Sequence, residues 1–194
     1  MLVALVLGLA IPGMAAAQGN QDNTQTAELY KVQAAFHRYA TVHDPVNGDS
    51  SEIITQRIRD MLSLWTSNAV LNVQGFGAID GYYIGRGDPD DPSSCPETTG
   101  SAGSYRGTLC TYFKWVAGSF QVANKLIVLT PSYSTSFDIT GNAATGYWEC
   151  HYYDVSTSPW TAKVKIRTNT SFQKVNGNWL LSSIGVTPAG IPVP

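Results

Sequence analysis

The sequence predicts an α+β fold in which three helices pack on one face of a strongly curved antiparallel sheet. Two apolar patterns with helical spacing come first in the chain. From Lys125 onward, long runs rich in Val, Ile, Tyr, Thr and Trp are separated by turn signals, which is typical of strands. A run of helices followed by a run of strands favours helices gathered on one face of an antiparallel sheet.

The first residues predict an export signal. Residues 2–17 form an apolar run that ends in three alanines, as in a secretory signal peptide cleaved after Ala17. No Lys or Arg precedes this run, and a buried N-terminal helix is the alternative interpretation. We therefore expect an exported protein, periplasmic or extracellular, with a flexible mature N-terminus over residues 18–26. One domain is expected over residues 27–194.

Three helices are predicted. Residues 27–43 place apolar side chains at largely helical spacing and end near Pro45, because the residue before a proline disfavours the α region. Ser50 or Ser51 can cap a second helix over residues 52–65. A third helix is predicted at residues 108–124, after a long loop at residues 85–104 that is rich in Gly, Pro, Ser and Asp. Loops of that length are uncommon in compact domains and are often functional.

Strands account for the remaining segments. Residues 69–74 predict a first strand, and residues 82–84 predict a short partner after the Asp80-Gly81 turn. A four-stranded antiparallel meander is predicted at residues 125–139, 143–155, 161–174 and 178–186.

The composition narrows the possible partners. The net charge is −2, the isoelectric point is near 5.8 and no basic run occurs, which argues against a nucleic-acid partner. No segment of the mature chain is apolar enough for stable membrane insertion. No Cys/His spacing resembles a zinc site, and no metal or cofactor motif is found, so we expect no cofactor.

The sequence contains three cysteines, and two of them flank part of the long loop. In an oxidising compartment a pair is expected to join, and Cys95 and Cys110 flank the Ser/Gly/Thr-rich part of that loop. A bridge between them would close a loop of about 15 residues and stabilise the fold by roughly 3 kcal/mol. Cys150 lies in a strand-like run and is expected to be a buried free thiol.

The order of elements and four short stretches resemble the NTF2-like superfamily, in particular its SnoaL-like, scytalone-dehydratase-like branch. The stretches are RYATVHD, LWTSNAVLNVQGFG, DITGNAATGYW and VNGNWLLSSIGV. The resemblance implies a cone of curved sheet and helices around an apolar pocket that binds a small molecule. It also implies a homodimer or homotrimer through the outer face of the sheet. The same fold hosts dehydratases, isomerases, hydrolases and non-catalytic binders, so it does not by itself imply one function.

The resemblance can be followed to individual positions. Scytalone dehydratases carry a Tyr-Asp pair at the end of the first helix, and the matching residues here are His43 and Asp44. Their two pocket histidines match positions near Leu129 or Thr130 and near Asp154, and their pocket asparagine matches a position near Thr168. This sequence therefore does not reproduce the dehydratase site, and the Arg and two Asp of limonene epoxide hydrolases are not evident either.

Histidine is the natural proton carrier near neutral pH, which makes His43 and His151 the predicted catalytic residues, with Asp44 and Glu149 as their carboxylate partners. For His43 the alternative is a cation that stabilises the C-terminus of a helix. On the predicted strand, alternation puts Glu149 and His151 on one face and Trp148 and Cys150 on the other. Either face can line the pocket.

The predicted substrate-binding residues are aromatic or polar: Tyr39, Trp65, Asn72, Gln74, Tyr83, Trp115, Tyr153 and Arg167. For Arg167, a cross-strand ion pair with Glu149 at a subunit surface is the favoured alternative. Together these residues predict a cofactor-independent lyase or isomerase. It would eliminate water or a small aldehyde from a hydroxylated, aromatic small molecule, or rearrange it. The alternative is a non-catalytic binder of an apolar ligand or an assembly domain.

Overall fold

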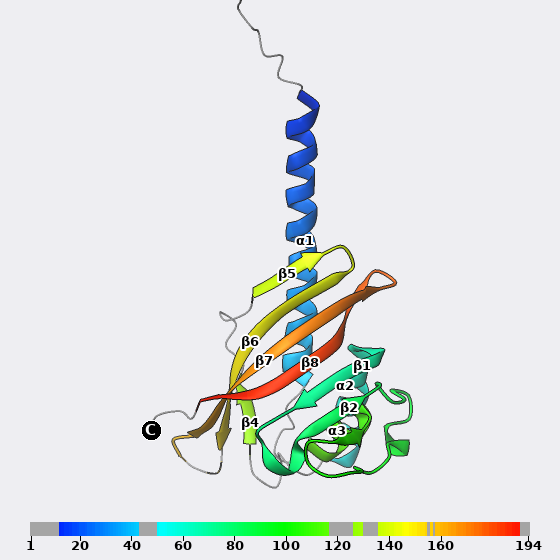
Figure 1. The fold of residues 1–194 in the computed structure, drawn as a ribbon, viewed down its shortest axis with the longest axis vertical. Helices are drawn as coiled ribbons and strands as arrows, with labels where there is room; N and C mark the ends of the chain where they lie inside the picture. Colours follow the sequence, from blue (N-terminus) through cyan, green and yellow to red (C-terminus); the bar gives the residue numbers. More distant parts are fainter. Residues whose placement is uncertain are drawn as a thin grey trace, which may run out of the picture.

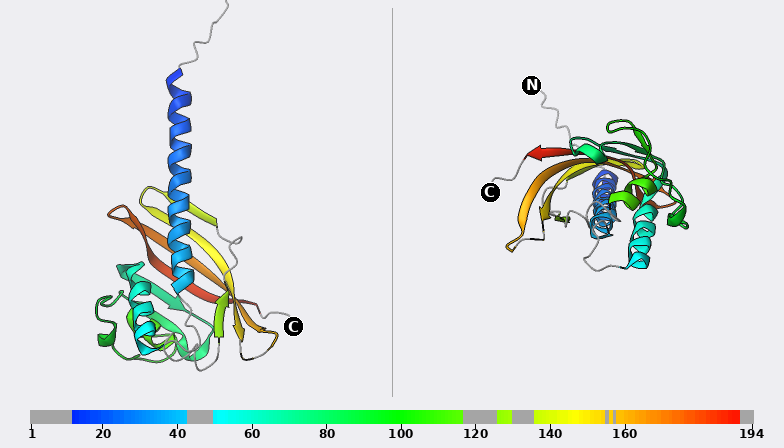
Figure 2. Two further views of the ribbon diagram at one scale, coloured as in Figure 1. Left: turned by 180° about the vertical axis from the view of Figure 1, so that it is seen from behind. Right: turned by 90° about the horizontal axis from the view of Figure 1, so that it is seen from below.

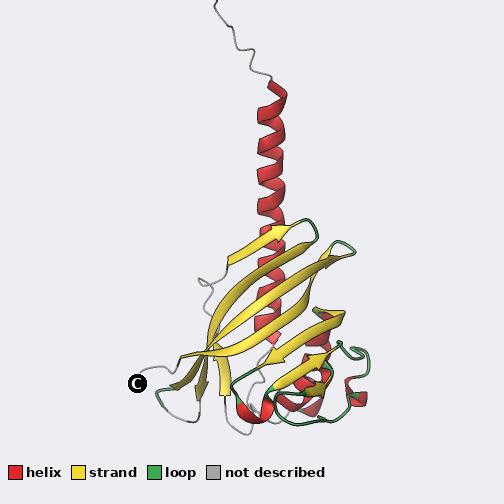
Figure 3. Ribbon diagram, in the orientation of Figure 1, coloured by secondary structure: helices red, strands yellow, loops and turns green. Residues whose placement is uncertain are grey.

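The structure, a computed structural model, describes residues 12–42, 50–116, 126–129, 136–154, 156 and 158–190. The elements in chain order are α1 (Pro12–Val42), α2 (Ser51–Ser63), β1 (Trp65–Val73), β2 (Gly81–Ile84), β3 (Tyr105–Gly107), α3 (Leu109–Trp115), β4 (Leu126–Leu129), β5 (Ser136–Thr140), β6 (Ala143–Asp154), β7 (Thr161–Val175) and β8 (Asn178–Gly190). Figure 3 shows helices and strands in the separate layers that the sequence predicts. The predicted α+β class is confirmed.

The strands form one sheet in the order β3-β2-β1-β8-β7-β6-β4, and β5 also pairs with β6. The meander β6-β7-β8 is antiparallel, as predicted. Two other pairs, β1 with β8 and β2 with β3, are parallel. Parallel neighbours need a long crossover connection, and most of the chain separates β1 from β8. The sheet is therefore mixed at the end that carries the short strands.

The helices lie on the concave face of the sheet. In Figure 2 the sheet curves around α1, and α2 and α3 lie on the same side. Along α1 the buried side chains are Val32, Phe36 and Tyr39, at the spacing of one helix face. The short helix α2 buries Ile58, Met61 and Leu62 against the same core.

The helix ends differ in part from the prediction. Helix α1 begins at Pro12 rather than Ala27, and its N-terminal part projects beyond the sheet (Figure 1). Packing on the sheet begins near Glu28, which accepts hydrogen bonds from Lys174 Nζ at 2.8 Å and Trp179 Nε1 at 2.7 Å. Ser50 caps α2 by accepting the N–H of Ile53, as predicted. Helix α3 ends at Trp115, and residues 117–125 lie outside the described residues.

Two strand boundaries also differ. The segment predicted as one strand, residues 125–139, contains two strands, β4 and β5, because β6 is long enough to pair with both. Trp65, predicted at the end of the second helix, begins β1 instead. Leu64 ends α2, and its carbonyl accepts the N–H of Leu181 on β8 at 2.8 Å, which draws the next residue into the sheet.

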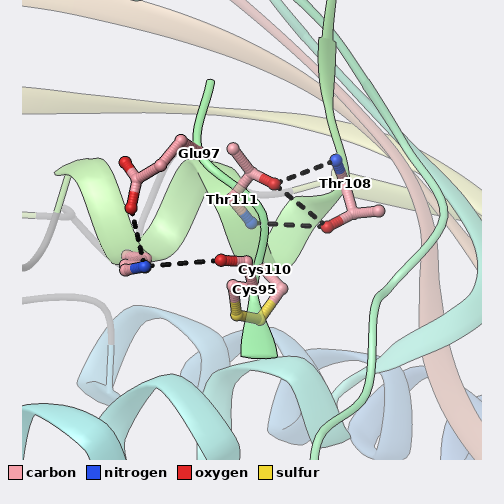
Figure 4. Close-up of polar contacts among 6 residues, drawn as sticks. Cys95, Glu97, Thr108, Cys110 and Thr111 are labelled. Carbon is pink, nitrogen blue, oxygen red and sulfur yellow. Dashed lines mark hydrogen bonds and ion pairs between the residues drawn. A yellow bond between two sulfur atoms is a disulfide. The ribbon is translucent and has the colours of Figure 1, made fainter. Parts of the chain in front are cut away.

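The predicted disulfide between Cys95 and Cys110 is present, with Cα atoms 5.5 Å apart. It ties the long loop to the first turn of α3 (Figure 4). Lys114 Nζ extends this connection by donating to the Cys95 carbonyl at 3.3 Å and pairing with Glu97 at 2.9 Å. Cys150 is buried and is not part of a disulfide, as expected.

Candidate functional site

Aromatic rings gather on the concave face where the helices meet the sheet. This inner aromatic cluster consists of Phe36, Tyr39, Trp65, Phe113 and Trp148, all of them buried. The Tyr39 ring lies 5.8 Å from the Trp65 ring and 6.2 Å from the Trp148 ring, both edge-on. Two predicted substrate-binding residues, Tyr39 and Trp65, are therefore in direct contact on the inner face.

Three layers of the fold hold this cluster together. Helix α1 contributes Phe36, whose ring is 5.0 Å from Trp148 on β6. Helix α3 contributes Phe113, whose ring is 6.1 Å from Trp65 at the start of β1. Offset and edge-on aromatic pairs of this kind are worth about 0.5–1.5 kcal/mol each beyond the area they bury. The cluster is thus a rigid wall on the concave face.

Two polar atoms within this apolar region lack a hydrogen-bond partner among the described residues. They are the indole nitrogen Nε1 of Trp65 and the hydroxyl Oγ1 of Thr168, and both residues are fully buried. The neighbouring indole of Trp148 is satisfied, since it donates to Thr170 Oγ1 at 2.8 Å. A buried polar group without a partner costs about 1–3 kcal/mol. A ligand that bonds to Trp65 and Thr168 would recover that cost.

Thr168 is the residue that the sequence interpretation did not assign to the site. It stands on β7 beside Trp148 of β6, on the inner face. The resemblance had matched its neighbourhood to a pocket asparagine, but threonine is common in strands, and its type alone gave no reason to select it. The sequence signal that could have identified it is the alternation along β7, where Thr168 shares its parity with the apolar Val164, Ile166 and Phe172.

Glu149 and His151 lie on the opposite, outer face of the sheet. Trp148 and Cys150 are buried beneath the helices, so alternation along β6 directs their neighbours outward. Glu149 is held by Lys165 Nζ at 2.6 Å and Arg167 Nη2 at 3.2 Å, and these cations lower the pKa of its carboxyl. The favoured alternative for Arg167, a cross-strand ion pair, is what the structure contains. Glu149 and His151 are thus separated from the inner aromatic cluster.

The other predicted substrate-binding residues are distributed around the sheet. Tyr83 is buried on the inner side, where its hydroxyl donates to the Ile79 carbonyl at 3.0 Å, and burial raises its pKa. Trp115 stacks with Arg106, whose guanidinium carbon is 5.5 Å from the ring centroid. Gln74 is exposed just beyond β1.

Asn72 and Tyr153 lie on the outer face. The Asn72 side chain is partly buried there, and the ring of Tyr153 is 6.2 Å from that of His151. The catalytic pair predicted at His43 and Asp44 lies outside the described residues and follows α1 directly in the chain. Of the predicted substrate-binding residues, only Tyr39 and Trp65 share the inner aromatic cluster.

Two cavities lie away from that cluster. One, of about 570 Å³, is on the outer face over β6, β7, β8 and β1, and its lining includes Asn72, Asn169, Ser171 and Gly185. We call it the outer trough. The second, of about 520 Å³, lies between α1 and β5, where Leu29 faces Phe137 and Ile139. Neither includes a residue of the inner aromatic cluster.

Among the described residues, no three His, Cys, Asp or Glu side chains are close enough together to hold a metal ion. No helix in the described ranges is sufficiently long and apolar to cross a membrane.

Comparison with known proteins supports the fold assignment. No protein-family profile matches the sequence, and no curated protein sequence matches it either. Solved structures do match over most of the chain. An NTF2-like protein with a cystatin-like fold from Novosphingobium aromaticivorans has a TM-score of 0.60 and 10% identity, with 94% of this chain and 92% of that chain covered.

Two further matching structures belong to proteins named for a reaction. A candidate dehydratase of the NTF2-like family from Streptomyces avermitilis has a TM-score of 0.54 and 11% identity, covering 86% of this chain and 99% of that one. The hexachlorocyclohexane dehydrochlorinase LinA-type3 from Novosphingobium barchaimii has the same TM-score and identity, with coverages of 88% and 92%. These likenesses show that the chain has the NTF2-like fold.

Proposed function

We propose that the protein is a cofactor-independent lyase that binds a small aromatic molecule against the inner aromatic cluster. The observation that carries the proposal is the pair of buried, unpartnered polar atoms, Trp65 Nε1 and Thr168 Oγ1, beside edge-on and tilted aromatic rings. Apolar pockets with a few convergent polar groups are the usual form of small-molecule sites. The rings would hold the aromatic part, and the two polar atoms would bind its oxygen substituents.

His43 and Asp44 are the proposed acid–base pair. They follow α1, and the last turns of that helix carry Tyr39 into contact with Trp65 and Trp148. The outer-face position of Glu149 and His151 revises their predicted catalytic role, because a group on that face cannot reach a ligand on the other side of the sheet. Proton transfer is therefore assigned to His43, with Asp44 orienting its ring.

The proposed reaction is an elimination. In a dehydration, His43 removes a proton from carbon, the C–O bond breaks, and the hydroxyl leaves as water after receiving a proton. In loss of an aldehyde, His43 instead removes the proton of a hydroxyl group. The adjacent C–C bond then breaks, and the resulting carbanion takes up a proton. The fold neighbours named as a dehydratase and a dehydrochlorinase support elimination over isomerisation.

Turnover of a panel of hydroxylated aromatic compounds, followed by mass spectrometry, tests this proposal. We expect a mass loss of water or a small aldehyde for at least one compound. His43→Ala should lower kcat/KM by about 100-fold or more. His151→Ala is the matched control on the outer face and should leave kcat/KM unchanged. Equal activity of the wild-type protein and His43→Ala would exclude the proposed acid–base pair.

A non-catalytic binder is the second candidate. The buried polar or charged residues described by the structure are four threonines and Arg106, with no carboxylate or imidazole among them. Binding and catalysis can be separated with Thr168→Val, which removes the hydroxyl, and Thr168→Ser, which retains it. Under the binder interpretation Thr168→Val weakens ligand binding, and no compound in the panel is turned over by any variant.

Export and self-association complete the proposal. The apolar run at residues 2–17 and the Cys95–Cys110 bridge support secretion to an oxidising compartment. N-terminal sequencing of the secreted protein should give Gln18 as the first residue. A homodimer or homotrimer is proposed from the resemblance, and light scattering of the purified protein tests it.

A further inference from the structure

Helix α3 forms one wall of the inner aromatic cluster, although it is only 7 residues long. It places the ring of Phe113 6.1 Å from that of Trp65 and the ring of Tyr112 4.8 Å from that of Tyr83. A helix shorter than about 12 residues is marginal in water without tertiary contacts. The position of this wall therefore depends on what holds α3 in place.

The first turn of α3 is held by the long loop (Figure 4). The N–H of Cys110 donates to the Arg86 carbonyl at 3.2 Å, where the loop begins, and its sulfur is bonded to Cys95 in the middle of the loop. The packing is close, since a Cβ atom added at Gly87 would lie 2.6 Å from that of Cys110. The disulfide thus adds the middle of the loop to a contact that its start already makes.

The loop also contacts the last turn of α3. Lys114 Nζ donates to the Cys95 carbonyl at 3.3 Å and pairs with Glu97 at 2.9 Å. The guanidinium carbon of Arg106 lies 5.5 Å from the centroid of the Trp115 ring. Cys95, Glu97 and Arg106 all belong to the segment of residues 95–110 that the disulfide closes. Opening the disulfide therefore frees the segment that makes these contacts.

Forming this disulfide is a two-electron oxidation. The two thiols lose two protons and two electrons, and a disulfide oxidant takes them up and becomes two thiols. Cytosolic thiols are kept reduced, whereas an oxidising compartment lets the bond form and persist. Cys95 and Cys110 are 6% and 1% exposed, so the bond is shielded once it has formed. The chain consequently has a reduced form before export and an oxidised form after it.

We propose that the Cys95–Cys110 disulfide completes the inner site, which binds its aromatic ligand tightly only after the chain is oxidised. In the reduced form α3 opens locally and Phe113 leaves Trp65, so the aromatic wall is incomplete. Neither cysteine lies in the meander β6-β7-β8, and the sheet therefore keeps its order. The ligand rests on the proposed function, whereas the effect on α3 does not.

Hydrogen exchange of the full chain tests the effect on α3, with the protein oxidised by oxidised glutathione or reduced by dithiothreitol. The amides of residues 109–115 should exchange about tenfold or more faster in the reduced form, and those of β7 and β8 should exchange equally in both forms. Reoxidation should restore slow exchange. Cys95→Ala should match the reduced form with or without dithiothreitol.

Glu97→Gln is the matched control in the same loop, because it removes an exposed ion pair and keeps the disulfide. Its exchange rates should stay within about twofold of those of the oxidised wild-type protein. The proposal is overturned if residues 109–115 exchange equally in the oxidised and reduced forms. It is also overturned if β7 and β8 lose protection by the same factor as α3, since the disulfide would then support the whole fold.

Calorimetric titration with 2-naphthol, a neutral hydroxylated aromatic probe, tests the effect on the inner site. The oxidised form should bind 2-naphthol about tenfold or more tightly than the reduced form, because less of the reduced protein is competent to bind. Equal, measurable binding to both forms overturns the proposal. If 2-naphthol binds to neither form, that result counts against the aromatic ligand of the proposed lyase. A difference in α3 exchange would then still support the disulfide as the device that positions α3.

Discussion

Strands β6, β7 and β8 present two different surfaces, and alternate residues of the same strands build them. Their inner side chains, such as Trp148, Thr170 and Ile184, are buried beneath the helices. Their outer neighbours, such as Tyr147, Asn169 and Gly185, are polar or small and reach solvent. Alternation along the strands separates the two sets, with one shift of register at Ser182 and Ser183 of β8.

The comparison shows where stability and recognition reside. The inner face combines aromatic packing with the satisfied indoles of Trp148 and Trp179 and the unpartnered polar atoms of Trp65 and Thr168. Most of its residues therefore stabilise the fold, and a few are available to a ligand. The outer face contributes ion pairs around Glu149 and an open trough. Substitutions on the inner face should therefore cost much more free energy of unfolding than substitutions on the outer face.

The largest effect is expected for Trp65→Ala. Removing a buried indole from the inner aromatic cluster should lower the free energy of unfolding by about 3–5 kcal/mol. Trp160→Ala is the matched control, because Trp160 is exposed beyond β6. It should change the free energy by less than about 0.5 kcal/mol. Urea denaturation measures both values, and equal losses would contradict the difference between the two environments.

A smaller effect should separate two threonines on the same face of β7. Thr170→Val leaves the buried Trp148 Nε1 without its acceptor and should cost about 1–3 kcal/mol. Thr168→Val removes a hydroxyl that has no partner among the described residues, so it should be neutral or slightly stabilising without ligand. If both variants lose the same stability in denaturation experiments, Thr168 is satisfied in solution.

The stability of the protein at low pH should depend on Glu28, whose carboxylate joins α1 to the sheet. Hydrogen bonds from Lys174, Lys31 and Trp179 lower the pKa of Glu28 from 4.5 to about 2. Because the pKa of Glu28 is lower in the folded state than in the unfolded state, the ionised carboxylate stabilises the protein at pH values above the unfolded-state pKa. That stabilisation should therefore decline as the pH falls from about 4.5 to 2. Thermal midpoints measured over this range should decline less steeply for Glu28→Gln than for the wild-type protein.

The smallest effect is expected for the outer ion pairs. Arg167→Ala removes one of two cations that contact Glu149, and Lys165 remains at 2.6 Å. Exposed ion pairs contribute about 0–1 kcal/mol, so the free energy of unfolding should change by less than about 0.5 kcal/mol. A loss above 2 kcal/mol in urea would show that the outer face is buried in an assembly.

Much of the fold followed from local patterns. Alternation and turn residues located β6, β7 and β8, and helical spacing located the packed part of α1. The parallel pairing of β1 with β8 could not be predicted, because it depends on contacts between distant segments. The position of Trp65 in β1 could not be predicted for the same reason. Its spacing is helical, but the hydrogen bond between the Leu64 carbonyl and the Leu181 N–H places it in the sheet.

The sequence left more open about the candidate site than about the fold. Tyr39 and Trp65 were candidate aromatic walls of a pocket, and both lie buried on the inner face. The face of β6 could not be settled, since Trp148 and His151 were equally plausible pocket residues by type. Burial decided it, because the helices cover the more apolar of the two faces.

The contacts of Glu28 constrain the order in which the chain can fold. Glu28 accepts hydrogen bonds from Lys174 and Trp179, which lie 146 and 151 positions later in the sequence. The ribosome makes α1 first and the β7–β8 hairpin last, so these contacts cannot form until nearly the whole chain has emerged. Pairings of such long range slow folding. A chain that crosses a membrane with its N-terminus leading would therefore reach the far side unfolded and assemble there, where Cys95 and Cys110 can also be joined.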